Sequence, residues 1–274
     1  MKVEVLLSTM NQKNDKFIES MNLQTDTLVI NQTNNKFAYR ELFKESSKIR
    51  IFSMQEKGIG LSRNSALMRA EGDICLLADD DMVYNPKYEN IILEAFNSQP
   101  NADIILFNVP SSNENRPTVN IKTIRRVRNY NFMRYGAVNI AFRKNSIWNA
   151  NISFSLLFGG GARYSAGEDS LFLFECLRKG LRIETNPKEI AVVNQEESTW
   201  FEGYNDKYFF DKGVFFAALS KNLSLLLVIQ FLLRKYRLYK RDNTVPNALS
   251  MMLKGMNNFK KGEVDVLDKQ TKKN

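Results

Sequence analysis

The fold is decided by the stretch Gly72-Asp73-Ile74-Cys75-Leu76-Leu77-Ala78-Asp79-Asp80-Asp81-Met82. Its apolar middle is rich in β-formers and predicts a buried strand. The strand ends on three consecutive carboxylates, which repel one another unless positive charge lies beside them. A hard divalent cation held by oxygen ligands is the usual neutraliser. An acidic turn in solvent is the alternative, and the flanking residues decide between the two.

The composition of the 274-residue chain limits the classes of function. Its net charge of +9 suggests an anionic partner, which is a nucleic acid, a lipid surface or a phosphorylated substrate. The absence of histidine excludes histidine-based triads and most zinc sites. Cys75 and Cys176 lie in apolar patterns and are interpreted as buried side chains in a reducing compartment. Because we find no signal peptide and no apolar run of about 18 residues, we expect a cytoplasmic protein.

Short apolar strands alternate with helical patterns along the first 200 or so residues, which is typical of a mostly parallel α/β sheet. The strands are expected at 3–7, 27–30, 49–53, 74–78, 103–109, 137–142 and 190–193. Ligands of such sheets bind at the carboxyl ends of the strands. We therefore expect Thr9 to Asn11, Asn31, the turn at Arg63 and Asp79 to Asp81 to converge on one edge.

The turn before the acidic strand contains two glycines and opens a helix. Ser62 is its expected N-cap, and Gly72 is expected to stop it. After the strand, Pro86 lies where the next helix is expected to begin. Residues 110–135 are polar and basic, and they are expected to form a loop or hairpin over the site. Their arginines include Arg125, Arg126, Arg128 and Arg134.

A second acidic pair, Glu168-Asp169, begins a helix that closes at Gly180. The helix dipole favours acidic side chains in a first turn, so a purely structural role is one interpretation of the pair. The preceding run Gly159-Gly160-Gly161 fits either a backbone that approaches a sugar closely or a flexible turn.

Together these motifs resemble those of the family 2 glycosyltransferases, over roughly residues 3 to 200. The order and spacing of Arg63-Asn64, Ala70, Gly72, the acidic triplet and Gly167-Glu168-Asp169 match the motifs of that family. The resemblance implies the GT-A fold, a Rossmann-like and mostly parallel sheet flanked by helices. It also implies metal-dependent, inverting transfer from a UDP- or GDP-sugar. The Gln-x-x-Arg-Trp motif of processive synthases is missing, so we expect transfer of a single sugar.

On the donor side, the resemblance assigns the nucleotide-sugar to Thr9, Asn11, Asn31, Arg63, Asp79 and Asp80. Asp81 is implied as the direct ligand of Mn²⁺ or Mg²⁺, where the cation stabilises the charge of the departing diphosphate. Asp79 is implied to hold the ribose or to share the metal through water, and Asp80 takes either role or neither. Arg63 is implied to face the diphosphate, with a solvated arginine of a first helical turn as the alternative.

On the acceptor side, the resemblance makes Asp169 the base that removes the proton of the acceptor hydroxyl. Glu168 is implied to orient that base or to bind the acceptor. The acceptor is implied to be a glycan or a lipid-linked glycan in surface polysaccharide synthesis.

Two departures from the family pattern bear on the donor site. The second strand ends in Asn31-Gln32 instead of aspartate, which leaves the choice of base open. The histidine that often follows the last core strand is replaced by residues of the stretch 194–200. Either Gln195 or Glu196 substitutes for it, or aspartate, phosphate and water are the only ligands of the metal.

The chain is expected to divide into a catalytic domain, 1–205, a helical appendage, 206–259, and a disordered tail, 260–274. Within the catalytic domain, residues 1–109 form the nucleotide-sugar half and 110–205 the acceptor half. In the appendage, residues 214–241 contain no acidic side chain, and an apolar run is followed by a basic one. That pattern suits a helix in an anionic membrane interface at the inner face of the membrane. A helix that packs on the core with a solvated basic end is the alternative.

Two other classes of function fit parts of the sequence. A nucleotidyltransferase needs a glycine-rich phosphate loop after the first strand, and residues 8–12 contain no glycine. A nucleic-acid binder would account for the charge and for the arginines at 125–134, with salt-sensitive binding. Because Asp79 to Asp81 repel a phosphate backbone, we expect no nucleic-acid partner.

Overall fold

The computed structural model describes residues 1–44, 47–114, 116–194 and 201–262. The chain forms two compact units. The first consists of residues 1–162 and 168–198, and the second of residues 163–167 and 199–274.

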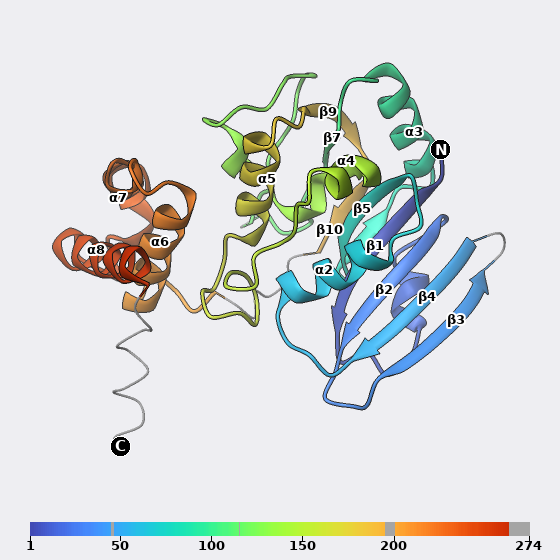
Figure 1. Ribbon diagram of the computed structural model, residues 1–274, viewed down its shortest axis with the longest axis horizontal. Coiled ribbons are helices and arrows are strands. Elements are labelled where there is room, and N and C mark those ends of the chain that lie inside the picture. The colour runs from blue at the N-terminus through green and yellow to red at the C-terminus, as the bar shows by residue number, and fades with distance from the viewer. Residues whose placement is uncertain (45–46, 115, 195–200, 263–274) are drawn as a thin grey trace. The chain divides into compact units, whose positions relative to one another are not determined.

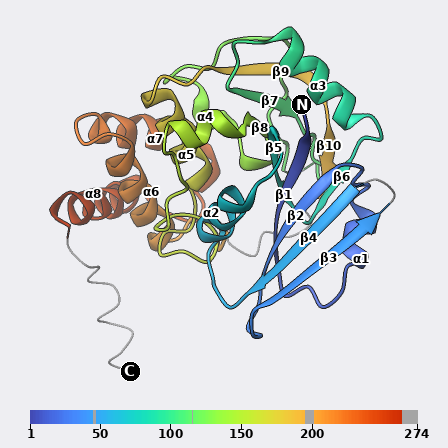
Figure 2. The same ribbon diagram turned by 45° about the vertical axis from the view of Figure 1, so that its right-hand side comes forward.

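The first unit is built on an eight-stranded sheet in the order β3-β4-β2-β1-β5-β8-β7-β9 (Figures 1 and 2). Its strands are β1 (Val3–Met10), β2 (Asp26–Gln32), β3 (Ala38–Lys44), β4 (Ser47–Met54), β5 (Ile74–Asp79), β7 (Ile104–Asn108), β8 (Ile140–Arg143) and β9 (Ile183–Glu189). The strands β1, β2, β4 and β5 pair in parallel, as do β7 and β9, whereas β3 and β8 are antiparallel to their neighbours. The predicted mostly parallel sheet is therefore confirmed.

Helices cover both faces of this sheet. They are α1 (Lys16–Ser20), α2 (Ile59–Arg69), α3 (Tyr88–Ser98), α4 (Lys144–Asn149) and α5 (Glu168–Arg178), with the 3₁₀ turns η1 (Phe132–Arg134) and η2 (Ala137–Asn139). Ile18 of α1 and Ile92 of α3 share a buried cluster with Val5 and Leu76. On the other face, Ser62 of α2 bonds Ser8 of β1. Because both faces are covered, β1 and β5 are buried almost to their ends.

The carboxyl ends of β1, β2, β4 and β5 meet at one edge of the sheet. The register pairs Ser8 with both Ile30 and Asp79, and Asn31 with both Thr9 and Ser53. Immediately after β5, the short strand β6 (Met82–Tyr84) pairs with β10 (Ala191–Val193). This two-stranded ribbon fixes the chain on the far side of the acidic triplet, since the Asn194 amide donates to the Asp81 carbonyl at 2.8 Å.

Several elements differ from the expectations. The predicted N-cap Ser62 lies inside α2, which begins after Gly58, and α2 ends at Arg69 rather than at Gly72. Gly72 instead allows close packing, because a Cβ there would lie 2.6 Å from the Cβ of Glu4. The stretch 137–142 divides into η2 and the start of β8. The strands β3, β6 and β9 were not predicted.

The second unit consists of α6 (Asp206–Leu219), α7 (Ser224–Tyr239) and α8 (Val245–Lys261), so the predicted helical appendage is confirmed. The helices α6 and α8 cross at glycines. A Cβ on Gly213 would lie 1.9 Å from the Met252 carbonyl oxygen, and one on Gly255 would lie 2.1 Å from that of Phe210. Of the helices in the described ranges, none has both the length and the apolar composition that crossing a membrane requires.

Candidate functional site

The acidic triplet lies at the end of β5, where the sheet edge opens. Ile74 to Ala78 are buried, whereas the carboxylates of Asp79, Asp80 and Asp81 are partly exposed. Three carboxylates therefore lie at the turn between the buried hydrophobic part of β5 and Met82. The turn places each carboxylate in a different environment.

Asp80 is tied to the end of β1. Its Oδ2 accepts hydrogen bonds from the Thr9 hydroxyl and, at 3.0 Å, from Gln12 Nε2. Thr9 therefore reaches the site as predicted, but through Asp80. Gln12 was missed in the sequence, where only its place directly after the first strand pointed to it.

Asn31 braces the loop that follows β1. Its Oδ1 accepts a hydrogen bond from the backbone N–H of Gln12 at 3.0 Å. Its Nδ2 donates to the backbone carbonyl of Gln12 at 2.9 Å and to Ser53 Oγ at 3.3 Å. Asn11, the residue between strand and loop, has φ 55° and an exposed side chain. The asparagine tolerates this left-handed backbone, which turns the chain back over β2. Asn31 thus shapes the loop, and Asn11 is exposed on it.

Arg63 joins the two acidic segments of the site. It is only 4% exposed, and its guanidinium donates to Glu168 Oε1 at 2.8 Å and to Asp79 Oδ1 at 3.2 Å. Burial alone would lower the pKa of Arg63, but the carboxylates of Asp79, Glu168 and Asp169 outweigh burial and raise it. The arginine is therefore a fixed positive charge between β5 and the start of α5.

The helix that carries Arg63 is seated on the loop before α5. Asn64 exchanges hydrogen bonds with the Phe154 backbone, at 2.9 and 2.7 Å. The Ile59 amide donates to the Gly160 carbonyl at 2.9 Å, and a Cβ on Gly60 would lie 2.2 Å from the Ser155 carbonyl oxygen. A Cβ on Gly159 would lie 2.5 Å from Ile59 Cγ2, so glycines on both sides allow α2 to pack tightly on this loop.

Asp169 lies in the first turn of α5, next to Glu168. Its Oδ1 accepts from the Ser170 amide at 2.6 Å. Its Oδ2 faces Gly136, where an added Cβ would lie 3.6 Å away. Gly136 directly precedes η2, and Asn139 of that turn donates from its Nδ2 to the Phe107 carbonyl at 2.9 Å. Glycine at 136 therefore leaves space beside the carboxylate that was not foreseen from the sequence.

The environment of Asp81 fits a divalent cation. Among the described residues, its buried Oδ1 has no hydrogen-bond partner. Burial and the carboxylates of Asp79 and Asp80 raise the pKa of Asp81 to about 6. Burial also raises the pKa of Asp79, against the lowering effect of Arg63. A cation beside the triplet would relieve this repulsion and give the orphaned oxygen a partner.

The described residues contain no group of three or more acidic or cysteine side chains arranged to hold a metal ion by themselves. A cation at Asp81 would thus also need oxygens from a ligand or from water. Gln195 and Glu196, the suggested replacements for the missing histidine, lie outside the described residues.

Apart from Asp81, the predicted site residues therefore fall into three groups, and Gln12, which was not predicted, joins the second. Arg63, Asp79 and Glu168 are in direct contact, with Asp169 near enough to act on the charge of Arg63. A second group, Thr9, Gln12 and Asp80, is hydrogen-bonded at the end of β1. In the third group, Asn31 of β2 holds the loop that carries Gln12, and Asn11 lies at the start of that loop.

The chain matches a known family in sequence and solved proteins in structure. Residues 32–157, which hold Arg63 and the acidic triplet, match the model of glycosyl transferase family 2. This match ends before Glu168. No curated protein sequence matches the chain.

The fold is similar to that of S. aureus TarS. TarS 1–349 in complex with UDP-GlcNAc has a TM-score of 0.63 and 15% identity, over 96% of this chain and 93% of that one. Another structure of S. aureus TarS has a TM-score of 0.59 and 15% identity, over 86% of this chain and 44% of that one. TarS 1–349 in complex with UDP has a TM-score of 0.57 and 15% identity, over 98% of this chain and 95% of that one. At such identities the likeness shows the fold alone.

Proposed function

We propose that this glycosyltransferase, whose residues 32–157 match the model of glycosyl transferase family 2, moves one sugar from a nucleotide-diphosphate sugar to an acceptor hydroxyl with inversion. The observation that carries the proposal is the Arg63 bridge. It holds Asp79, at the end of β5, and Glu168, at the start of α5, on one guanidinium. Asp169, which follows Glu168 and also acts on the charge of Arg63, would thus present an acceptor-side carboxylate near those that would face the donor.

For the donor we propose a UDP-sugar. Support comes from the solved neighbours, whose structures hold UDP-GlcNAc and UDP. In this chain the nucleotide would lie over the carboxyl ends of β1 and β2. Asp80, held by Thr9 and Gln12, would bind the ribose hydroxyls. Asn11, exposed on the adjoining loop, would line the nucleotide.

For the cation we propose Mn²⁺ or Mg²⁺, held by Asp81 with Asp79 near it. When bound, it stabilises the negative charge that develops on the departing diphosphate. The unsatisfied Oδ1 of Asp81 and the raised pKa of its carboxyl support this assignment. Arg63 does not need to contact the diphosphate in this arrangement, because its guanidinium is already held by two carboxylates.

Asp81→Ala is expected to remove the dependence of donor binding on manganese. Calorimetric titration of UDP-GlcNAc with and without manganese measures this dependence. The matched control is Asp73→Ala, at the other end of the same strand, where the carboxylate accepts from the Lys2 amide. If Asp81→Ala and Asp73→Ala respond to manganese alike, Asp81 is not a metal ligand.

For the acceptor we propose a glycan or a lipid-linked glycan. Its hydroxyl would lie beside Asp169, on the side of the sugar opposite the leaving diphosphate. Asp169 takes the proton as the hydroxyl attacks the anomeric carbon, and the bond to the diphosphate breaks in the same displacement. Glu168 acts through its ion pair with Arg63, which fixes the first turn of α5.

Peripheral membrane contact through residues 214–241 is part of the proposal, and α7 carries it. Val228, Leu232 and Tyr239 are buried against the second unit. The outer face exposes apolar side chains at helical spacing, namely Leu225, Leu226, Ile229, Leu233 and Tyr236. Arg234, Lys235, Arg237 and Lys240 follow at the carboxyl end and are exposed. An apolar stripe beside basic side chains fits the interface of an anionic membrane.

Leu226→Ser/Leu233→Ser is expected to lower binding to vesicles of phosphatidylcholine and phosphatidylglycerol by at least about 100-fold, because each of the two leucines contributes about 1.5–3 kcal/mol when buried. Vesicle sedimentation measures the loss. Phe43→Ser/Met68→Ser is the control, since these two side chains are equally exposed in the first unit. Equal sedimentation of both variants and the parent protein would show that α7 does not enter the membrane.

A further inference from the structure

The positive charge of the chain is concentrated in a segment that the proposed function does not yet use. No acidic residue occurs between Glu114 and Glu168. Within this interval, five basic residues lie close together in the sequence and are exposed: Lys122, Arg125, Arg126, Arg128 and Arg134. We name these five the basic track.

The backbone of the basic track is held in place along β9. The Arg125 amide donates to Thr185 Oγ1, and the Thr185 amide donates to the Arg125 carbonyl, both at 2.9 Å. The Val127 amide donates to the Ile183 carbonyl at 2.8 Å, and the Val127 side chain is buried. The arginines are thus displayed on a fixed edge of the unit, and not on an unrestrained loop.

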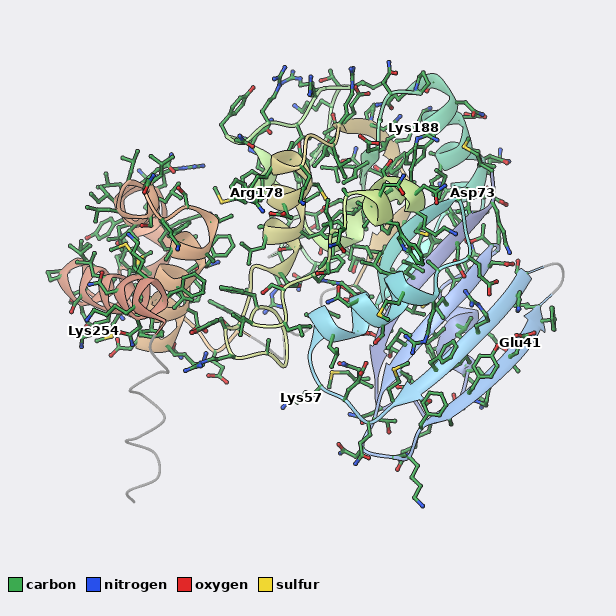
Figure 3. The ribbon with its side chains drawn as sticks, in the orientation of Figure 1. Glu41, Lys57, Asp73, Arg178, Lys188 and Lys254 are labelled. Atoms are coloured by element: carbon green, nitrogen blue, oxygen red, sulfur yellow. The ribbon has the colours of Figure 1, made fainter. Side chains whose placement is uncertain are left out.

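The charges of the basic track are not neutralised within the described part of the chain. None of the five forms an ion pair there, and Arg125 Nε donates only to the Thr123 hydroxyl. Glu184, which is paired across from Arg126, is largely buried and is bound by Arg182 and Gln99. Lys188, labelled in Figure 3, adds an exposed positive charge near the end of β9, whereas Arg178 at the end of α5 is paired with Glu175.

The basic track leads to the carboxylate assigned to the acceptor. Phe132, at the start of η1, packs on Phe174 of α5 with 5.6 Å between ring centroids. Arg134 ends η1, and two residues later Gly136 faces Asp169. Two residues span at most about 7 Å, so the backbone of the last residue of the track lies near the carboxylate of Asp169. Tyr130, 83% exposed, adds an aromatic face between Arg128 and Arg134.

We propose that the basic track binds the acceptor, and that the acceptor is an anionic glycan with phosphate or other acidic groups along its chain. This inference rests on the proposed function, because it takes Asp169 as the point of sugar transfer. Charges repeated along the track suit an acceptor whose own charges repeat. We assign membrane contact to the exposed apolar face of α7 and not to the basic track. A single-stranded nucleic acid stacks successive bases on aromatic side chains, and within residues 122–134 Tyr130 is the exposed aromatic side chain.

The test compares phosphorylated dextran with unmodified dextran of the same length, so that charge is the difference between the probes. Binding is measured by fluorescence anisotropy at several salt concentrations. Arg125→Gln/Arg126→Gln/Arg128→Gln is expected to weaken binding of phosphorylated dextran at least about tenfold. It should also make the slope of log affinity against log salt shallower by roughly 2, for three lost contacts. Lys36→Gln/Lys44→Gln/Lys87→Gln removes the same charge from exposed positions elsewhere in the unit.

Three outcomes would overturn the proposal: equal binding of the two dextrans, equal losses in the two triple variants, or tighter binding of oligo-dT than of phosphorylated dextran. Thermal unfolding of each variant verifies that it is folded. Titration of the parent protein with UDP-GlcNAc is done separately. If the donor does not bind while phosphorylated dextran binds through the track, the proposed function fails and the anionic binding surface stands.

Discussion

Asp169→Asn is expected to lower the rate of sugar transfer by about 1,000-fold, within the range of effects of a lost general base, while the affinity for UDP-GlcNAc changes little. The amide has nearly the shape of the carboxylate but does not accept the proton of the acceptor. Single-turnover release of UDP from UDP-GlcNAc measures the step without a known acceptor, because water then replaces the glycan hydroxyl. Calorimetric titration measures the donor affinity of the same variant.

Two controls separate a base from a residue that only stabilises the helix. An acidic side chain in a first helical turn contributes about 0.3–1 kcal/mol, so Asp169→Asn should change the unfolding midpoint only slightly. Glu175→Gln, later in α5 and paired with Arg178, should leave UDP release near the parent rate. Near-normal UDP release by Asp169→Asn would mean that another group takes the proton.

The edge of the sheet was predictable because parallel strands have a strict geometry. Buried strands of apolar residues form the middle of the sheet, and their carboxyl ends meet at one edge. The sequence therefore predicts that the polar residues at the carboxyl ends of β1, β2 and β5, and in the turns that follow, lie in one region. The contacts themselves were not predictable, since they depend on side-chain length. Asn31 reaches Gln12 and Ser53, whereas Thr9 reaches Asp80.

The strands β3 and β9 escaped prediction for different reasons. Along β3, most side chains are exposed on both faces, so the sequence carries no apolar alternation. The strand β9 contains Asn186-Pro187-Lys188, and proline is depleted in strands because it lacks a donor. Both strands lie at the ends of the sheet order, where these irregularities are tolerated.

The contacts of Arg63 could be predicted from the spacing of the motifs only in part. The sequence placed this arginine at a turn and the resemblance directed it toward the diphosphate. In the structure the guanidinium is buried and is bound by the carboxylates of Asp79 and Glu168. These two residues lie far apart in the chain, so the sequence does not indicate that both contact Arg63. Packing of α2 on the loop 154–161 through glycines then buries the guanidinium. A position in a single sequence does not report such a contact.

Arg63→Met is expected to destabilise the first unit by about 2–4 kcal/mol, which is below the usual cost of breaking a buried ion pair because Asp79 is partly exposed. Methionine keeps much of the side-chain volume but leaves the carboxylates of Asp79 and Glu168 without their cation. For a unit of this size the midpoint of thermal unfolding should fall by about 5–12 °C. Arg69→Met is the control on the same helix, where the guanidinium stacks on Phe52 and bonds a carbonyl.

A double-mutant cycle tests whether the loss comes from the ion pair or from packing. If Glu168 is destabilising once Arg63 is gone, Glu168→Gln should cost stability in the parent protein and restore part of it in Arg63→Met. If Glu168→Gln has the same effect in both backgrounds, the two side chains are not coupled, and Arg63 does not join β5 to α5. A coupled pair would explain why one buried arginine lies between donor-side and acceptor-side carboxylates. Its charge lets these carboxylates occupy one site, where their mutual repulsion would otherwise drive them apart.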